Sequence, residues 1–180
     1  MTCFTIPIRR AQQLNDVAVV FSHSGFQFLS TQKNELTRNE FRELLDLSKW
    51  HERTLVLCNT SLINVDLSDL EINFVNFVNV DLTSAKFNRS SLTCVSFECA
   101  FMFKSEFNES QWHHVIVSKS NMSHSIMREI ELSNVQFKFG TNLYGIKTNY
   151  NGAEQLLRCN RNDTIHQDIT IMDSGLRLIR

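Results

Sequence analysis

The residues best suited to chemistry in this 180-residue chain are cysteines and histidines near its middle. Cys94 and Cys99 precede the pair His113 and His114, and thiolate and imidazole groups are ligands that zinc prefers. A cysteine beside a histidine is also the pairing that activates a thiolate nucleophile. Both chemistries need side chains that converge on one point, so they depend on the elements that carry these four residues.

Signatures of other chemistry are missing from the sequence. The five cysteines are odd in number and none is spaced Cys-x-x-Cys, which favours free thiols over a disulfide framework or a structural zinc site. The sequence has no glycine-rich phosphate loop, no His-Glu-x-x-His motif and no Gly-x-Ser-x-Gly motif. We therefore expect a protein that is not an enzyme, with no catalytic residue, no cofactor and no metal ion.

The charge balance restricts the class of partner. Lysine and arginine number 18 and aspartate and glutamate 19, for a net charge of -1. A nucleic-acid binder usually has a basic excess, so we expect no direct nucleic-acid binding. No apolar run reaches the roughly 18 residues of a membrane span, so we expect no transmembrane segment, while peripheral membrane association stays open.

A five-residue repeat dominates the middle of the chain. Every fifth residue from Leu57 to Phe137 is large and apolar, and the residues two positions earlier are mostly small or β-branched. An α-helix turns through about 500° in five residues, which would scatter the apolar side chains around its axis. A flat strand would send successive ones to opposite faces, because five is odd. The repeat therefore predicts a solenoid whose chain turns a corner every five residues.

Several stretches resemble the Ala-(Asp/Asn)-Leu-x-x pattern of the pentapeptide-repeat family. They are Leu-Ser-Asp-Leu-Glu, Val-Asn-Val-Asp-Leu-Thr-Ser-Ala-Lys-Phe and Ser-Asn-Met-Ser-His-Ser, and the resemblance covers about residues 55–139. It implies a mainly β fold, a right-handed quadrilateral β-helix with four pentapeptides per coil. Residue i then stacks on residue i+20.

The flanking segments predict caps for this β-helix. In segment 1–54, Thr37 and Glu40 have capping-box spacing, and Phe41 begins an apolar stripe. We therefore expect a helix at about 38–50 that covers the open N-terminal end of the 55–139 β-helix, since an uncovered coil exposes unpaired backbone groups. Segment 140–180 is expected to form a small mixed C-terminal cap or tail, with a short helix that Asn151 and Glu154 cap and that ends at Cys159.

Stacking by 20 residues also settles the expectation for the cysteines and histidines. Cys94 lies above His114 in the same outward column, with His113 beside it. Side chains in one ladder run parallel, whereas zinc ligands and catalytic pairs converge. The repeat therefore predicts surface histidines and an ordinary thiol.

Four phenylalanines remain unexplained by the repeat and the N-terminal segment: Phe74, Phe101, Phe103 and Phe139. Phe101 and Phe103 flank the inward Met102, so both should project from one face. Adjacent exposed aromatic side chains indicate a contact surface. These four residues are the candidate interaction surface, with docking under the chain's own flanking segments as the alternative for Phe74 and Phe139.

The layout of a short helical N-terminal region before a pentapeptide β-helix is similar to that of bacterial type III secreted effectors. This similarity implies a non-enzymatic protein-interaction module with a role in virulence, held in the bacterial cytoplasm and then secreted into a host cell to bind a host protein. Two alternatives stay open, a DNA mimic that binds a type II topoisomerase and the targeting or substrate-presenting part of a larger enzyme. The mimic needs an acidic solenoid, but residues 55–139 carry nine acidic and six basic residues. Dimerisation through a solenoid end also stays open.

Overall fold

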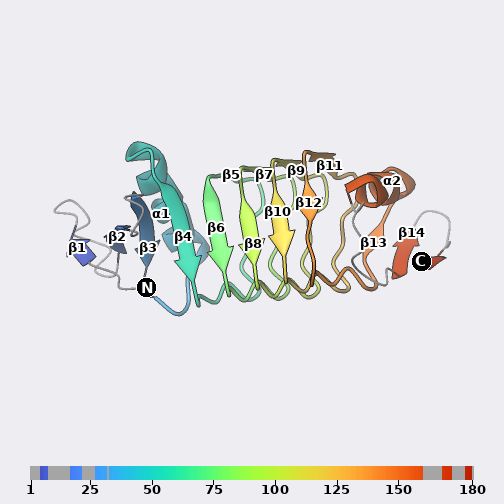
Figure 1. The fold of residues 1–180 in the computed structure, drawn as a ribbon, viewed down its shortest axis with the longest axis horizontal. Helices are drawn as coiled ribbons and strands as arrows, with labels where there is room; N and C mark the ends of the chain where they lie inside the picture. Colours follow the sequence, from blue (N-terminus) through green and yellow to red (C-terminus); the bar gives the residue numbers. More distant parts are fainter. Residues whose placement is uncertain are drawn as a thin grey trace.

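The computed structural model describes residues 33–159 throughout and, outside them, the backbone of five short strands. These are β1 (Thr5–Pro7), β2 (Val17–Phe21), β3 (Gln27–Thr31), β14 (Asp168–Ile171) and β15 (Arg177–Ile179). The described residues form a mainly β, four-sided parallel solenoid with a helix at each end (Figure 1).

The four sides of the solenoid differ in how their rungs pair. Side one consists of β4 (Thr54–Cys58), β6 (Val75–Val78), β8 (Ser96–Glu98), β10 (Ile116–Ser118) and β12 (Gln136–Phe137). Side four consists of β5 (Glu71–Asn73), β7 (Ser91–Thr93), β9 (Gln111–His113) and β11 (Glu131–Ser133). Sides two and three pair through single parallel bridges, such as Asp81↔Phe101 and Lys86↔Glu106. The 20-residue register confirms the predicted coil.

Corners repeat every fifth residue and share one backbone conformation. From Asn59 to Asn134 each corner residue has a φ between 50° and 60°. This left-handed conformation costs a non-glycine residue about 1–2 kcal/mol. Hydrogen bonds between rungs and burial of the core must therefore offset a penalty at every corner.

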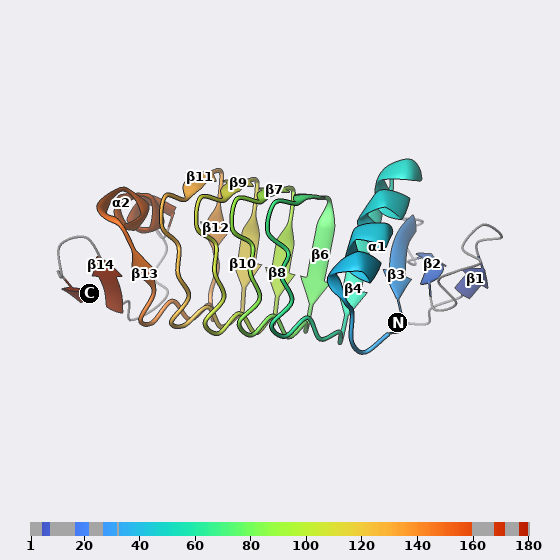
Figure 2. The same ribbon diagram turned by 180° about the vertical axis from the view of Figure 1, so that it is seen from behind.

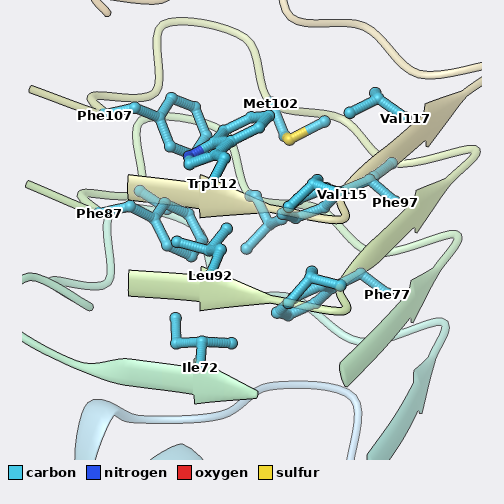
Figure 3. Close-up of a cluster of buried hydrophobic side chains, with 14 of the residues drawn as sticks. Ile72, Phe77, Phe87, Leu92, Phe97, Met102, Phe107, Trp112, Val115 and Val117 are labelled. Carbon is cyan, nitrogen blue, oxygen red and sulfur yellow. The ribbon is translucent and has the colours of Figure 1, made fainter. Parts of the chain in front are cut away.

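The inward columns form the core (Figure 3). Phe77 stacks on Phe97 and Phe87 on Phe107, each pair with ring centroids 4.9 Å apart. The small column beside them is buried as well and leaves room for the rings; its members include Ala85, Ala100, Ser105 and Ser120. Burying each phenylalanine contributes about 1.5–3 kcal/mol, so the stacks are a main source of stability.

The coil continues past residue 139, the boundary that the repeat predicted. Asn121 pairs with Asn142, 21 residues on, and Leu143 and Thr148 continue the inward columns. Gly140 and Gly145, with φ of 80° and 69°, occupy the next two corners. One inserted residue shifts the five-residue pattern, so a fixed step from Leu57 does not reach these last two rungs.

At the N-terminal end, α1 (Arg38–Trp50) confirms the predicted helix and its capping box. The Glu40 carboxylate accepts hydrogen bonds from Lys33 and Thr37, which lower its pKa to about 2. α1 buries Phe41 against Phe77, with ring centroids 6.0 Å apart. Next to it, β3 pairs parallel with β4 and extends side one toward β2 and β1 (Figures 1 and 2).

At the C-terminal end, α2 (Tyr150–Cys159) closes the last rungs. Its first turn is capped by Asn149, whose Oδ1 accepts from the Gly152 N–H at 3.0 Å, so the prediction that Asn151 caps this helix was wrong. The Gln155 amide binds the Leu132 N–H at 2.7 Å and the Ile130 carbonyl at 2.8 Å. This side chain therefore replaces the next rung of side four. Beside it, β13 (Lys147–Thr148) pairs with β14, and β14 with β15.

Candidate interaction surface

Phe101 and Phe103 lie on one rung of side two, on either side of the buried Met102. Phe101 is 51% exposed. Phe103 is half-buried, because Lys104 places its Nζ over the ring, 5.0 Å from the centroid. The strand-like geometry of the rung sends alternate side chains outward, so both rings project from the same side of the solenoid.

The position of Phe101 departs from a local rule of side two. At the equivalent position in other rungs, Asp81, Asn121 and Asn142 each accept a hydrogen bond from the N–H two residues on, at 2.9 to 3.0 Å. A phenylalanine ring cannot accept this bond. The rung thus forgoes a hydrogen bond and exposes an aromatic ring, and such a break without an evident structural gain is typical of functional positions.

A ladder of aromatic rings continues from Phe103 toward the C-terminal end. The His124 ring packs edge-on against Phe103 and against Tyr144, with centroids 5.6 Å apart in both contacts. We define the aromatic surface as Phe101, Phe103, His124 and Tyr144. A Cβ at Gly145 would lie 2.7 Å from His124 Nδ1, so glycine leaves the space that the imidazole occupies.

Sequence reasoning missed two members of this surface. Tyr144 follows the inserted residue, so stacking by 20 residues assigns it to the corner column of His124, whereas the bridge between Asn121 and Asn142 places it in the column of Phe103. His124 is a corner residue and is not one of the four candidate phenylalanines. The signal that could have revealed the shift is the pair Gly140 and Gly145, five residues apart at positions that require a left-handed turn.

The other two candidate phenylalanines lie elsewhere on the solenoid. Phe74 is 56% exposed at a corner between sides four and one, where it lines a cavity beside α1. Phe139 is 81% exposed near the C-terminal end, and its carbonyl accepts from the Lys119 N–H. The structure therefore places Phe101 and Phe103 together and separates Phe74 from them.

The cysteines and histidines that could do chemistry do not converge. Cys94 and His114 are exposed corner residues with φ of 54° and 55°, and His113 lies on side four. Within residues 33–159 and the described strands, no three histidine, cysteine or acidic residues are grouped to hold a metal ion. In the same part of the chain, neither helix is long and apolar enough to cross a membrane.

Charged side chains form their own ladder at the corner between sides three and four. Arg89 donates two hydrogen bonds to the Asp69 carboxylate, at 2.7 and 2.8 Å. This pairing lowers the pKa of Asp69 and raises that of Arg89. On side three, the side-chain Oδ1 of Asn88 accepts from the Asn108 N–H at 2.9 Å, and that of Asn108 accepts from the Arg128 N–H at 3.1 Å. These ladders bind rungs to one another.

No protein-family model matches the sequence, and a search of curated proteins finds no significant match. Among solved structures, the chain is similar to the pentapeptide repeat protein Rfr23 of the cyanobacterium Cyanothece, at 18% identity over 65% of this chain and 61% of that one, with a TM-score of 0.35. It is similar to QnrB1, a plasmid-mediated fluoroquinolone resistance protein, at 12% identity over 64% and 62%, with a TM-score of 0.29.

A third similar structure is HetL, a pentapeptide repeat protein involved in heterocyst differentiation regulation in the cyanobacterium Nostoc. The identity is 15% over 62% of this chain and 53% of that one, with a TM-score of 0.31. The chain spans less than two thirds of the length of each of these three proteins. The five-residue repeat and the four-sided parallel coil identify the chain as a protein with the pentapeptide-repeat fold.

Proposed function

We propose that this protein is a non-enzymatic interaction module that binds a protein partner through the aromatic surface of side two. The observation that carries the proposal is Phe101, which stands where three other rungs of side two have an asparagine or aspartate that accepts a hydrogen bond from the backbone. Large aromatic residues supply much of the binding energy of protein interfaces. A side of the solenoid presents such residues on a rung whose backbone is hydrogen-bonded to the rungs on both sides.

The double substitution F101D/F103T tests this proposal because it copies the preceding rung. In that rung Asp81 accepts from the Thr83 N–H at 2.9 Å. We expect the variant to be more stable than the parent by about 0.5–1.5 kcal/mol, since it regains a hydrogen bond. Partner binding should fall at least about 100-fold, because aromatic hot spots contribute about 2 kcal/mol or more each.

The measurement is thermal unfolding alongside quantitative affinity capture of partners that the parent chain enriches. Tyr150→Ser is the matched control, since Tyr150 is 71% exposed and lies outside the aromatic surface. It should retain every partner. A folded F101D/F103T variant that captures the same partners with the same affinity would contradict the proposal.

We further propose that the module acts as a bacterial virulence effector that passes from the bacterial cytoplasm into a host cell and binds a host protein there. The proposal draws on the order of a short N-terminal segment with a capping helix followed by the solenoid. A fusion of residues 1–54 to a translocation reporter should give a host-cell signal that disappears in a strain whose secretion system is inactive. An equal signal from both strains, or none from either, rejects this delivery route.

The charges of the solenoid favour this interaction role over mimicry of DNA. Basic residues are interspersed among the acidic ones, and Arg89 pairs with Asp69 directly. DNA presents a phosphate about every 1.7 Å along its axis, which this pattern does not reproduce. Addition of the protein to a gyrase supercoiling reaction with a quinolone should leave inhibition unchanged, and strong protection would instead favour the mimic.

A further inference from the structure

The first coil of the solenoid is closed on three of its four sides. On side one, β3 pairs with β4, and on side two Glu35 forms a bridge with Ser61. On side three, the Arg38 guanidinium donates to the carbonyls of Asp66 and Ser68, the latter at 2.8 Å. Backbone groups that would otherwise be left at a coil edge are thus paired.

Side four of the same coil is different, because β5 is the terminal strand of its sheet. The hydrogen bonds to the next rung show which backbone groups are already used. The Ser91 N–H donates to the Leu70 carbonyl, and the Phe74 N–H donates to the Thr93 carbonyl, on either side of β5. The same register directs the N–H and C=O of Glu71 and Asn73 away from β7, toward α1. Among the described residues, none continues β5 on this edge.

A cavity of about 550 Å³ lies between this edge and α1. Leu45, Leu70 and Phe74 supply its apolar lining, and Glu71 and Asn73 lie along its coil side. Its charged residues are of mixed sign: Arg42, Asp46, Lys49, Glu52, Arg53, Asp69 and Glu71. The Nζ of Lys49 and a carboxylate oxygen of Glu71 are 3.9 Å apart, and both side chains are exposed.

We propose that this groove binds an extended peptide segment of a partner protein, which adds as a parallel strand to the free edge of β5. Binding by strand addition takes its affinity from main-chain hydrogen bonds and its specificity from pockets for alternate side chains. The groove offers two N–H and two C=O groups on alternate residues and one apolar patch. The matching ligand therefore has an apolar residue between two polar ones, as in a rung of the solenoid.

The size of the groove favours a single strand over a second copy of the chain. A volume of about 550 Å³ falls within the 300–1,000 Å³ typical of small-ligand pockets. α1 forms the wall opposite β5, so the groove is closed on the side from which a broad sheet edge would approach. The mixed charges of the lining do not select a strongly acidic or basic peptide, which leaves the backbone as the main recognition element.

The test uses the full chain and the acetylated, amidated peptide Leu-Glu-Ile-Asn-Phe, the sequence of residues 70–74 that forms a side-four rung. We expect submillimolar binding, with the amide signals of Glu71 and Asn73 shifted in NMR spectra and their hydrogen exchange slowed. Asn73→Pro removes one N–H that faces the groove and, by the register, no bond to β7. It should weaken binding about tenfold, as loss of a hydrogen bond of about 1.4 kcal/mol would.

Two controls separate this site from the aromatic surface and from misfolding. The F101D/F103T variant should bind the peptide normally, whatever happens to the partners of side two. A peptide methylated on its isoleucine nitrogen should bind the parent chain at least tenfold more weakly, because that N–H is expected to donate to the Glu71 carbonyl. This second measurement needs no variant of the protein.

Any of four results would show that the free edge of β5 does not bind a strand: no binding at millimolar peptide, shifts confined to other residues, equal binding of the methylated peptide, or slow exchange of Glu71 and Asn73 in the free chain. If sedimentation shows a dimer that the peptide dissociates, the occupant is a second copy and the partner-peptide proposal is wrong.

Discussion

Replacing Phe97 with alanine is expected to lower the free energy of unfolding by about 3–5 kcal/mol, the range measured for large-to-small changes of buried aromatic residues. Phe97 is fully buried, stacks on Phe77 at 4.9 Å and lies 6.0 Å from the Trp112 ring. Backbone hydrogen bonds fix the spacing of neighbouring rungs, so the rungs cannot move into the space that the phenyl ring leaves. The cavity should therefore persist, and its full cost should appear in urea unfolding curves.

The fluorescence of Trp112 provides a second readout for this variant. Its Nε1 is the one buried side-chain polar atom without a hydrogen-bond partner in the described part of the chain. Water that enters the cavity could reach this N–H and shift the emission to longer wavelength. Phe103→Ala is the control, because Phe103 lies on the outside of the coil and should change stability by less than about 1 kcal/mol. Equal losses for the two variants would refute the assignment of the stacks as the core.

Replacing Gly152 with alanine is expected to destabilise the C-terminal cap by about 1–3 kcal/mol, although alanine is the better helix former by about 1 kcal/mol. A Cβ at this position would overlap Thr148 Oγ1 and lie 3.1 Å from the Met127 carbonyl. α2 would have to move away from the last rung. The Gln155 bond to the Leu132 N–H would then lengthen or break.

Hydrogen exchange at Leu132, together with thermal unfolding, measures this effect. Asn151→Ala is the matched control, since Asn151 is exposed in the same helix and the change should be neutral or slightly stabilising. A Gly152→Ala protein as stable as the parent, with unchanged exchange at Leu132, would show that the contact between α2 and the coil is looser than described.

Much of the fold could be predicted because its signals are local. The five-residue spacing of Leu57, Phe77 and Phe97 requires a chain that turns at regular intervals, whatever lies above or below each rung. The capping box of Thr37 and Glu40 predicted α1 within a residue, because both partners lie in one helical turn. The same holds for the outward projection of Phe101, which follows from alternation along a single rung.

The parts that could not be predicted depend on residues that meet across coils. One inserted residue before Gly140 moves Tyr144 out of the corner column of His124 and into the column of Phe103, and the shifted coil continues to Thr148. Asn149 caps α2 because the last rung ends there. The apolar repeat alone does not reveal such a shift, since its period resumes unchanged after it; the signal is instead the glycine pair at the shifted corners, Gly140 and Gly145.

Sequence by itself determined that this chain is a five-residue solenoid with inward apolar columns, since each unit must turn its own large residue toward the axis. Only the tertiary structure decided which outward residues form a surface and which edge stays open. The aromatic surface needs Phe103, His124 and Tyr144 in consecutive coils. The groove exists because α1 leaves space beside β5 while β3 and Arg38 close other sides of the first coil. The contacts of β3 and Arg38 with this coil join residues whose separation along the chain does not follow the period of the repeat.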